Sequence, residues 1–299
     1  MSNRNIQISF KVDSNEQMEI LNKMIEKGIE PEVDGKPILI WTAENGHTEL
    51  IKKLKKARKN KGCYHYLTYS NETISKAIYL ASKNGHTEIA RILIKDRAAK
   101  ELIPNAKPIN TKYYYDFNGY NEIIKGFLSA VENGHTEIVK LYLEAGMNAN
   151  VKDNEALYLA TKNGHTQIVE MLIRTVIKQY ESRKKDVLKN RRYDILNENE
   201  RKFFDEVFYL AVNNGHTKIV KLLLELQRSL YEDYKAKSLN DLLVNLATSK
   251  VHTQIVYELV YEGINIDSGY VREALRIAIQ NGHVEIEKIL KNAGVKDLI

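Results

Sequence analysis

The sequence predicts an all-α solenoid of about seven helix–turn–helix repeats, and three observations support this fold class. A short phrase, Asn-Gly-His-Thr-Glu-Ile in its fullest form, recurs along the 299 residues. Each copy lies between two apolar segments that have helical spacing. Successive copies lie 30 to 51 residues apart, which is the scale of a repeat protein. We therefore expect a first helix, a turn and a second helix in every copy.

The turn of each copy carries the same residue types, and seven of the eight histidines lie in it. Its Gly is expected to end the first helix in the left-handed conformation, and its Thr to cap the second helix through the hydroxyl. The seven turns are predicted at residues 45–48, 84–87, 133–136, 163–166, 214–217, 250–253 and 281–284. A small residue lies three positions before each Asn, or before Lys250, and lets neighbouring helices approach: Thr42, Ala81, Ala130, Ala160, Ala211, Ala247 and Ala278.

The two ends of the repeat array differ from its middle. We expect residues 1–14 to be a flexible N-terminus, and residues 15–299 to form a single solenoid. Residues 15–28 read as a second helix without a first one, and so as an N-terminal capping helix. In the last copy Glu287 occupies a slot that is apolar in the others, as a terminal unit with a polar outer face requires.

The intervals between motif histidines are 39, 49, 30, 51, 36 and 31 residues, against about 33 for an undisturbed unit. The two shortest intervals follow the copies in which Gly146 and Gly263 stand eight residues after the motif Ile. Four copies have another residue there: Arg58, Arg97, Val176 and Gln227. We expect the second helix to overrun in these four. The extra residues form helical or loop insertions at about 58–72, 97–121, 175–203 and 227–238.

Two of these insertions have a more specific expectation. The segment between Gly164 and Gly215 contains no Gly or Pro, so we expect helix to about residue 190 and a break near Asn197. The insertion at 97–121 contains Pro104 and Pro108 and is expected to be mostly loop.

The repeated phrase resembles the ankyrin repeat over roughly residues 15–297. The family pattern Leu-Ala-Ala-x-x-Gly-His is recognisable in the segment from Leu159 to His165. The family's Thr-Pro-Leu-His opening is missing, and those slots read Glu-Ala-Leu-Tyr at 155–158. The resemblance implies a non-enzymatic scaffold or adaptor that binds a protein of unknown identity through a concave face, hairpin tips and insertions. The tips are expected near Asp34-Gly35, Lys152-Asp153-Asn154 and Ser268-Gly269.

The resemblance also places candidate binding residues. The position two before each motif Gly faces the concave surface in the family. We name this set the recognition column, and it reads Glu44, Lys83, Glu132, Lys162, Asn213, Ser249 and Gln280. This polar and variable column suits partner recognition, although a solvated face has the same composition. Tyr113, Tyr114 and Tyr115 crowd one insertion and are candidate interface anchors, or pack the insertion onto the solenoid.

The charge leaves a second function open. The net charge of +6 is mild for this length and does not by itself indicate nucleic-acid binding. Two basic clusters, at 52–61 and 183–192, are either solvated helix faces or a binding site for nucleic acid or another anionic surface. Their members include Lys52, Lys53, Lys55, Lys56, Arg58, Arg183, Lys184, Lys185, Arg191 and Arg192.

We predict no catalytic residues, no metal site and no cofactor. The motif histidines fall one to a repeat, about 10 Å apart if the units stack, so we expect each ring to bond backbone between neighbouring units. Cys63 and His65 have no recognisable catalytic partner.

The remaining expectations concern the setting in which the chain works. We expect a monomer without a membrane span, in a reducing interior. The Lys-, Asn- and Ile-rich composition fits an AT-rich genome of an intracellular bacterium or large DNA virus, whose ankyrin proteins often act on host targets.

Overall fold

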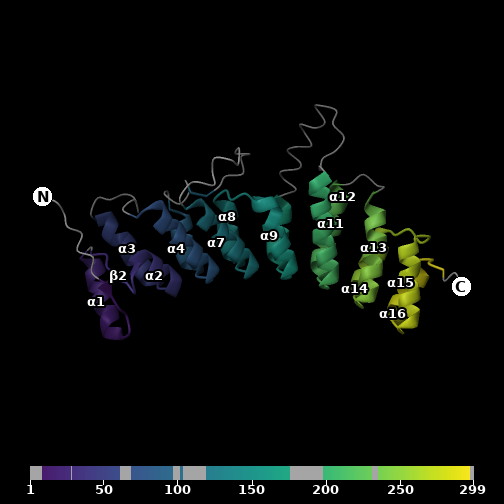
Figure 1. Cartoon of the computed structure of the whole chain (residues 1–299), viewed down its shortest axis with the longest axis horizontal. Helices are drawn as coiled ribbons and strands as arrows, with labels where there is room; N and C mark the ends of the chain where they lie inside the picture. The colour runs from purple at the N-terminus through teal and green to yellow at the C-terminus, as the bar shows by residue number, and fades with distance from the viewer. Residues whose placement is uncertain are drawn as a thin grey trace, which may run out of the picture. The chain divides into compact units, whose positions relative to one another are not determined.

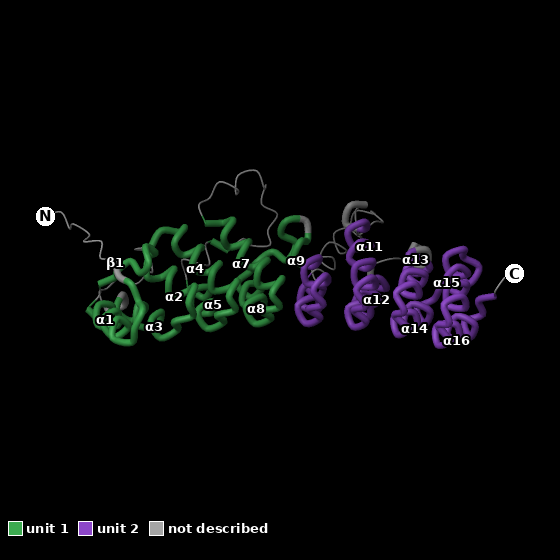
Figure 2. Tube along the Cα trace, turned by 60° about the horizontal axis from the view of Figure 1, so that its bottom comes forward, with its two compact units in different colours: residues 1–156 green, residues 157–299 purple. Residues whose placement is uncertain are grey.

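The structure, a computed structural model, describes residues 9–27, 29–60, 69–96, 102–103, 119–175, 198–230 and 235–296. It is an all-α repeat fold built from pairs of antiparallel helices (Figure 1). The chain forms two compact units, residues 1–156 and 157–299, coloured separately in Figure 2. The division falls within helix α9.

The first unit begins with a small sheet and one helix: β1 (Ser9–Phe10), α1 (Asn15–Glu26), β2 (Glu32–Val33) and β3 (Lys36–Pro37). Strand β2 pairs parallel with β1 and antiparallel with β3, and Asp34 and Gly35 form the left-handed turn of the hairpin. Helix α1 starts with a capping box in which Ser14 and Gln17 satisfy each other's backbone N–H groups.

The end of the segment 1–14, which was expected to be flexible, has ordered contacts in the structure. Residues 9–10 are a strand, and Val12 packs on the core cluster of Leu21, Val33 and Trp41. The backbone pairing and this apolar contact hold the segment in place. Residues 1–8 lie outside the described part of the chain.

The first unit continues with α2 (Ile38–Asn45), α3 (Thr48–Asn60), α4 (Asn71–Lys83), α5 (Thr87–Ile94), α7 (Tyr120–Glu132), α8 (Thr136–Glu144) and the start of α9 (Val151–Lys162). The first helices α2, α4 and α7 pack side by side, and so do the second helices α3, α5 and α8 (Figure 2).

The second unit contains the end of α9, a helical segment at 166–175, α11 (Glu198–Asn213), α12 (Thr217–Leu230), α13 (Lys235–Ser249), α14 (Thr253–Glu262), α15 (Gly269–Gln280) and α16 (Val284–Asn292). The same two rows recur, with α11, α13 and α15 in one and α12, α14 and α16 in the other.

The small residues predicted to lie between first helices are all fully buried, from Thr42 to Ala278. A side chain larger than Thr there would push neighbouring first helices apart. The motif Ile and the residue after it are also buried in every copy except the last, where Glu287 follows Ile286. Glu287 is partly exposed and pairs with Lys291 at 2.5 Å.

The second helices differ in length, though not always as expected. Helices α3 and α12 have 13 and 14 residues, against 9 and 10 for α8 and α14, which stop at a glycine. The expected overrun is wrong for α5, which ends at Ile94, before Arg97. The N–H of Asp96 bonds the carbonyl of Leu93, and such a tight last turn satisfies a terminal carbonyl without a left-handed residue. The helix of the fourth copy reaches residue 175, and its expected course to residue 190 and break near Asn197 lie outside the described residues.

The other two expected tips contain no β-strand among the described residues. Lys152 and Asn154 take positive φ angles at the start of α9, and Ser268 is the N-cap residue of α15. In the insertion at 97–121, Leu102 and Ile103 are described and buried.

One buried contact in the first unit joins Tyr142, Ser82 and Gly126. Tyr142 stands where most other second helices have Leu, and its hydroxyl bonds that of Ser82 at 3.0 Å. Gly126 makes room for this ring, and a Cβ there would also stand 3.1 Å from the Cα of Tyr79. Complete burial raises the pKa of Tyr142, so its hydroxyl stays neutral.

We predict that Tyr142→Phe lowers the free energy of unfolding by about 1 to 2 kcal/mol, because it removes this bond and leaves the buried Ser82 hydroxyl unsatisfied. Urea denaturation of Tyr142→Phe, Ser82→Ala and the double variant measures the coupling. Additive effects would show that the two hydroxyls do not interact.

Candidate functional site

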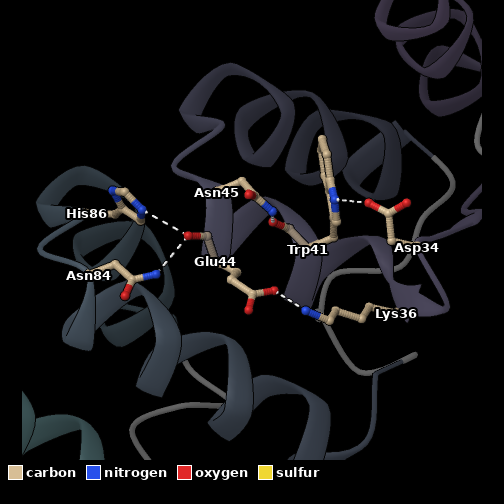
Figure 3. A network of polar contacts seen from close by, with 7 residues as sticks. All are labelled: Asp34, Lys36, Trp41, Glu44, Asn45, Asn84 and His86. Carbon is tan, nitrogen blue, oxygen red and sulfur yellow. Dashed lines mark hydrogen bonds and ion pairs between the residues drawn. The ribbon is translucent and has the colours of Figure 1, made fainter. Parts of the chain in front are cut away.

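At four junctions in the described part of the chain, the histidine of a repeat turn hydrogen-bonds one backbone carbonyl of the preceding repeat. In the first unit, His86 donates through Nε2 to the carbonyl oxygen of Glu44 at 3.1 Å, and Asn84 donates to the same oxygen at 2.8 Å (Figure 3). Because a carbonyl only accepts, Nε2 carries the hydrogen. We call the bond from histidine to carbonyl a rung, and at three of the four junctions an Asn of the same turn donates to the same oxygen.

Rungs recur in both units. His135 and Asn133 reach the carbonyl of Lys83 at 3.2 and 3.3 Å. In the second unit, His216 and Asn214 reach Lys162 at 3.4 and 3.3 Å, and His252 reaches Asn213 at 3.4 Å. The expectation that the motif histidines bond backbone between units is confirmed at these four junctions.

The motif Gly has two roles at a rung. It adopts a positive φ, 77° at Gly46 and 74° at Gly85, as the sequence predicts. It also leaves space for the next unit's ring, since a Cβ at Gly46 would stand 2.8 Å from the Cε1 of His86. The same distance is 2.7 Å between Gly85 and His135, and 2.8 Å between Gly215 and His252. A larger residue is therefore strained in its backbone and also displaces the ring.

The expected role of the motif Thr is wrong. Helix α5 has His86 as its N-cap, without a side-chain capping bond, and Thr87 is already the first helical residue. The Thr87 hydroxyl donates to the carbonyl of Gly85 at 3.3 Å, and Thr136 and Thr166 do the same in their turns. Thr therefore closes the glycine turn instead of capping the helix.

The junction between the sixth and seventh copies tests this account within the structure. Val251 replaces the Gly and keeps a φ of 60°, and it carries the Cβ that is absent from the glycines facing a ring at the other junctions. Among the described residues no bond joins His283 to Ser249, and Asn281 bonds the carbonyl of Ile277 in its own helix. The backbone turn itself is retained, with the His252 N–H bonded to Ala247 at 2.8 Å.

The first copy stabilises its turn differently. His47 stacks on Trp41 with ring centroids 4.6 Å apart, and the Trp41 Nε1 donates to Asp34 of the hairpin tip at 3.0 Å (Figure 3 shows Trp41 and Asp34). Burial, and secondarily the nearby His86, lower the pKa of His47 below 6.5.

The recognition column supplies the carbonyls of these rungs, so its backbone is fixed while its side chains point elsewhere. Lys83, Glu132, Lys162, Ser249 and Gln280 are exposed, and Glu44 and Asn213 are half-buried. The Glu44 carboxylate also pairs with Lys36 at 2.5 Å (Figure 3).

A second column on the same helix faces was missed from the sequence. Four residues before Lys83, Lys162 and Asn213 stand Tyr79, Tyr158 and Tyr209, and residues four apart share a helix face. Tyr158 and Tyr209 are 39 and 47% exposed, so part of each ring is open to a partner. The signal was present in the sequence as a tyrosine in the slot where the family's opening motif has a histidine. We call these three residues the tyrosine column.

The other predicted site residues are not brought together with these columns. Lys52 pairs with Glu49 at 2.8 Å, and Lys53 with Glu26 at 3.0 Å. Lys55 and Lys56 are exposed. The Arg58 side chain, Tyr113, Tyr114, Tyr115, Arg183, Lys184, Lys185, Arg191 and Arg192 lie outside the described residues.

A small hollow between α11 and α12 is lined mainly by apolar side chains, including Phe204, Phe208 and Leu223. Asp205 is its one ionisable lining residue, and burial raises the pKa of that carboxyl. Over the described ranges there is no group of three or more His, Cys, Asp or Glu that could hold a metal. No helix in this part of the chain is long and apolar enough to cross a membrane.

Comparison with known proteins gives one family. A family model for ankyrin repeats (3 copies) matches residues 9–107, 98–186, 127–227 and 208–297. The crystal structure of the human ASB11 ankyrin repeat domain is similar, with a TM-score of 0.50 and 16% sequence identity, over 86% of this chain and 97% of that chain. No curated protein matches the sequence.

We predict that Val251→Gly stabilises the last repeat by about 1 kcal/mol, because it removes the left-handed strain of a β-branched residue. It also opens the space that the His283 ring would need to form a rung. Hydrogen exchange of the α15 and α16 amides measures the change. The matched control, Gly215→Val, imposes the same strain one junction earlier and should weaken protection around it. Faster exchange in Val251→Gly would contradict the role given to the glycine.

The lowered pKa of His47 predicts a pH dependence. The folded state binds this proton less readily than the unfolded state, so the contribution of His47 to stability is complete above pH 6.5 and is lost as pH falls below it. Between pH 7.5 and 5, wild type should therefore lose more unfolding free energy than His47→Asn, as urea titrations measure. Equal losses would show that His47 titrates alike in both states.

Proposed function

Because the chain belongs to the ankyrin-repeat family, whose repeats are generally protein–protein interaction modules, we propose that it is a scaffold or adaptor that binds a partner protein through the first-helix faces of its units. The proposed contact residues are the recognition column and the tyrosine column. No reaction is part of the proposal.

One observation carries this proposal: at the recognition column the backbone carbonyl makes the bond between repeats, and the side chain takes no part in that bond. At Glu44, Lys83, Lys162 and Asn213 the rung uses the carbonyl alone. Any side chain is compatible with that bond, so the residue can be chosen for a partner without loss of the fold. A rigid surface with exchangeable side chains reduces the entropy lost on binding.

The tyrosine column adds suitable anchors. Tyr158 and Tyr209 occupy equivalent positions on α9 and α11 of the second unit and are partly exposed. Tyrosine buries a large area with few rotatable bonds and retains a hydroxyl for hydrogen bonding, which is why it is frequent among binding hot spots.

Two further aspects of the proposal concern the target and its setting. By analogy with ankyrin proteins of AT-rich genomes, whose composition this Lys-, Asn- and Ile-rich chain fits, the target is a host-cell protein; the single Cys63 suits a reducing compartment. A monomer is the form we propose. Binding of nucleic acid through residues 52–61 is not favoured, because Lys52 and Lys53 each contact a carboxylate.

We predict that changing Glu44, Lys83, Glu132 and Lys162 all to Ala abolishes partner capture from cell lysate and leaves the melting temperature within a few degrees of wild type. The second expectation follows because the rungs use backbone carbonyls, which Ala retains. Tyr257→Ala with Tyr261→Ala on the second helix α14 is the matched control, since both are exposed outside the two columns. A partner retained by the fourfold variant and lost from the control would contradict the proposal.

A further inference from the structure

In the first unit, two lysines of α4 lie over the ring of Tyr79, and a third lysine, from α7, shares the carboxylate of Glu122 with one of them. The Lys76 ammonium lies 5.0 Å from the ring centroid and that of Lys83 lies 6.0 Å from it. Lys76, Tyr79 and Lys83 lie on one face of α4, at the spacing i, i+3 and i+7. Lys125 comes from α7, and its ammonium lies 2.8 Å from Glu122, a carboxylate that is also 3.7 Å from the Lys76 ammonium. We call Lys76, Tyr79, Lys83 and Lys125 the lysine–tyrosine cluster.

The close approach of α4 and α7 brings this cluster together. Gly126 lies next to Lys125, and a Cβ on it would stand 3.1 Å from the Cα of Tyr79. The missing side chain thus lets the backbone of α7 lie against α4 at Tyr79. Helices that pack this closely bring side chains of both within reach of one bound group.

The charges within the cluster are not balanced. Glu122 is the carboxylate that faces it, and it is shared between Lys125 at 2.8 Å and Lys76 at 3.7 Å. No ion pair joins Lys83 to a carboxylate among the described residues, and its recorded contact is the Tyr79 ring. Three ammonium groups therefore face one carboxylate. Glu44 and Glu132 occupy the same column on either side of Lys83, and Glu44 is already paired with Lys36.

We propose that the lysine–tyrosine cluster binds an acidic segment of the partner protein, with a carboxylate placed between Lys83 and Lys76 over the Tyr79 ring. The inference rests on the proposed function, because it names the chemistry of the partner at that face. An incoming carboxylate interacts with two ammonium groups that the Tyr79 ring already holds in place. The side-chain entropy lost on binding is therefore small.

Fluorescence anisotropy with a labelled peptide of three consecutive glutamates flanked by Gly and Ser tests this directly. The full chain should bind it in low salt, more weakly as sodium chloride is added, and in preference to the matched peptide with three glutamines. Lys76→Gln, Lys83→Gln and Lys125→Gln combined should weaken binding by about tenfold, the scale of a few charge contacts on a surface. The control combines Lys140→Gln, Lys218→Gln and Lys250→Gln, three exposed lysines outside the cluster, and should change it less than twofold.

Other outcomes overturn the inference. Equal loss in both triple variants would mean that the peptide responds to net charge alone. A labelled single-stranded oligonucleotide that binds more tightly than the peptide, and is lost with the same three cluster lysines, would replace the acidic segment with a nucleic acid. If wild type does not bind the peptide while the fourfold alanine variant still loses the captured partner, the acidic segment is wrong and the proposed function stands.

Discussion

A hydrogen bond from a histidine ring to a backbone carbonyl of the preceding repeat is the constraint that aligns successive turns at four junctions in the described part of the chain. It joins residues 42, 52, 54 and 39 positions apart, so it does not depend on the length of chain between them. Insertions between repeats can therefore vary in length while the histidine of one turn still bonds the carbonyl next to the preceding turn. The bond also requires the glycine in the turn of the preceding repeat, which adopts the left-handed backbone and leaves the space that the histidine ring occupies.

The same bond explains why structure and recognition can coexist at one position. The carbonyl of Lys83 holds His135 and Asn133, while its ammonium lies over Tyr79. Selection for a partner can change the side chain without touching the rung. The junction at Val251 shows the opposite case, in which a side chain at the glycine position accompanies the loss of the rung to Ser249. Packing between α13 and α15 and between α14 and α16 still holds the last repeat.

The fold class, the buried small-residue column, the glycine turns and the role of the histidines could be predicted from sequence, because each follows from a residue type repeated at a fixed spacing. The role of Thr87 was predicted wrongly because a hydroxyl at a helix start can bond forward or back, and the choice depends on where the helix begins. The end of α5 at Ile94 was missed because a right-handed last turn needs no marker residue. Tyr79, Tyr158 and Tyr209 were visible in the sequence, but their exposure depends on how neighbouring helices pack. The site residues of the recognition column remain predictions.

The most direct test of the central constraint is the protonation of the histidine rings, read from nitrogen-15 chemical shifts of the imidazoles at neutral pH. The account predicts that His86, His135, His216 and His252 carry their hydrogen on Nε2, with Nε2–H exchange slowed by the bond to the carbonyl. His283, which follows Val251, should lack this slowing. Hydrogen on Nδ1 in the four rung histidines, or the same exchange rate in all five rings, would contradict it.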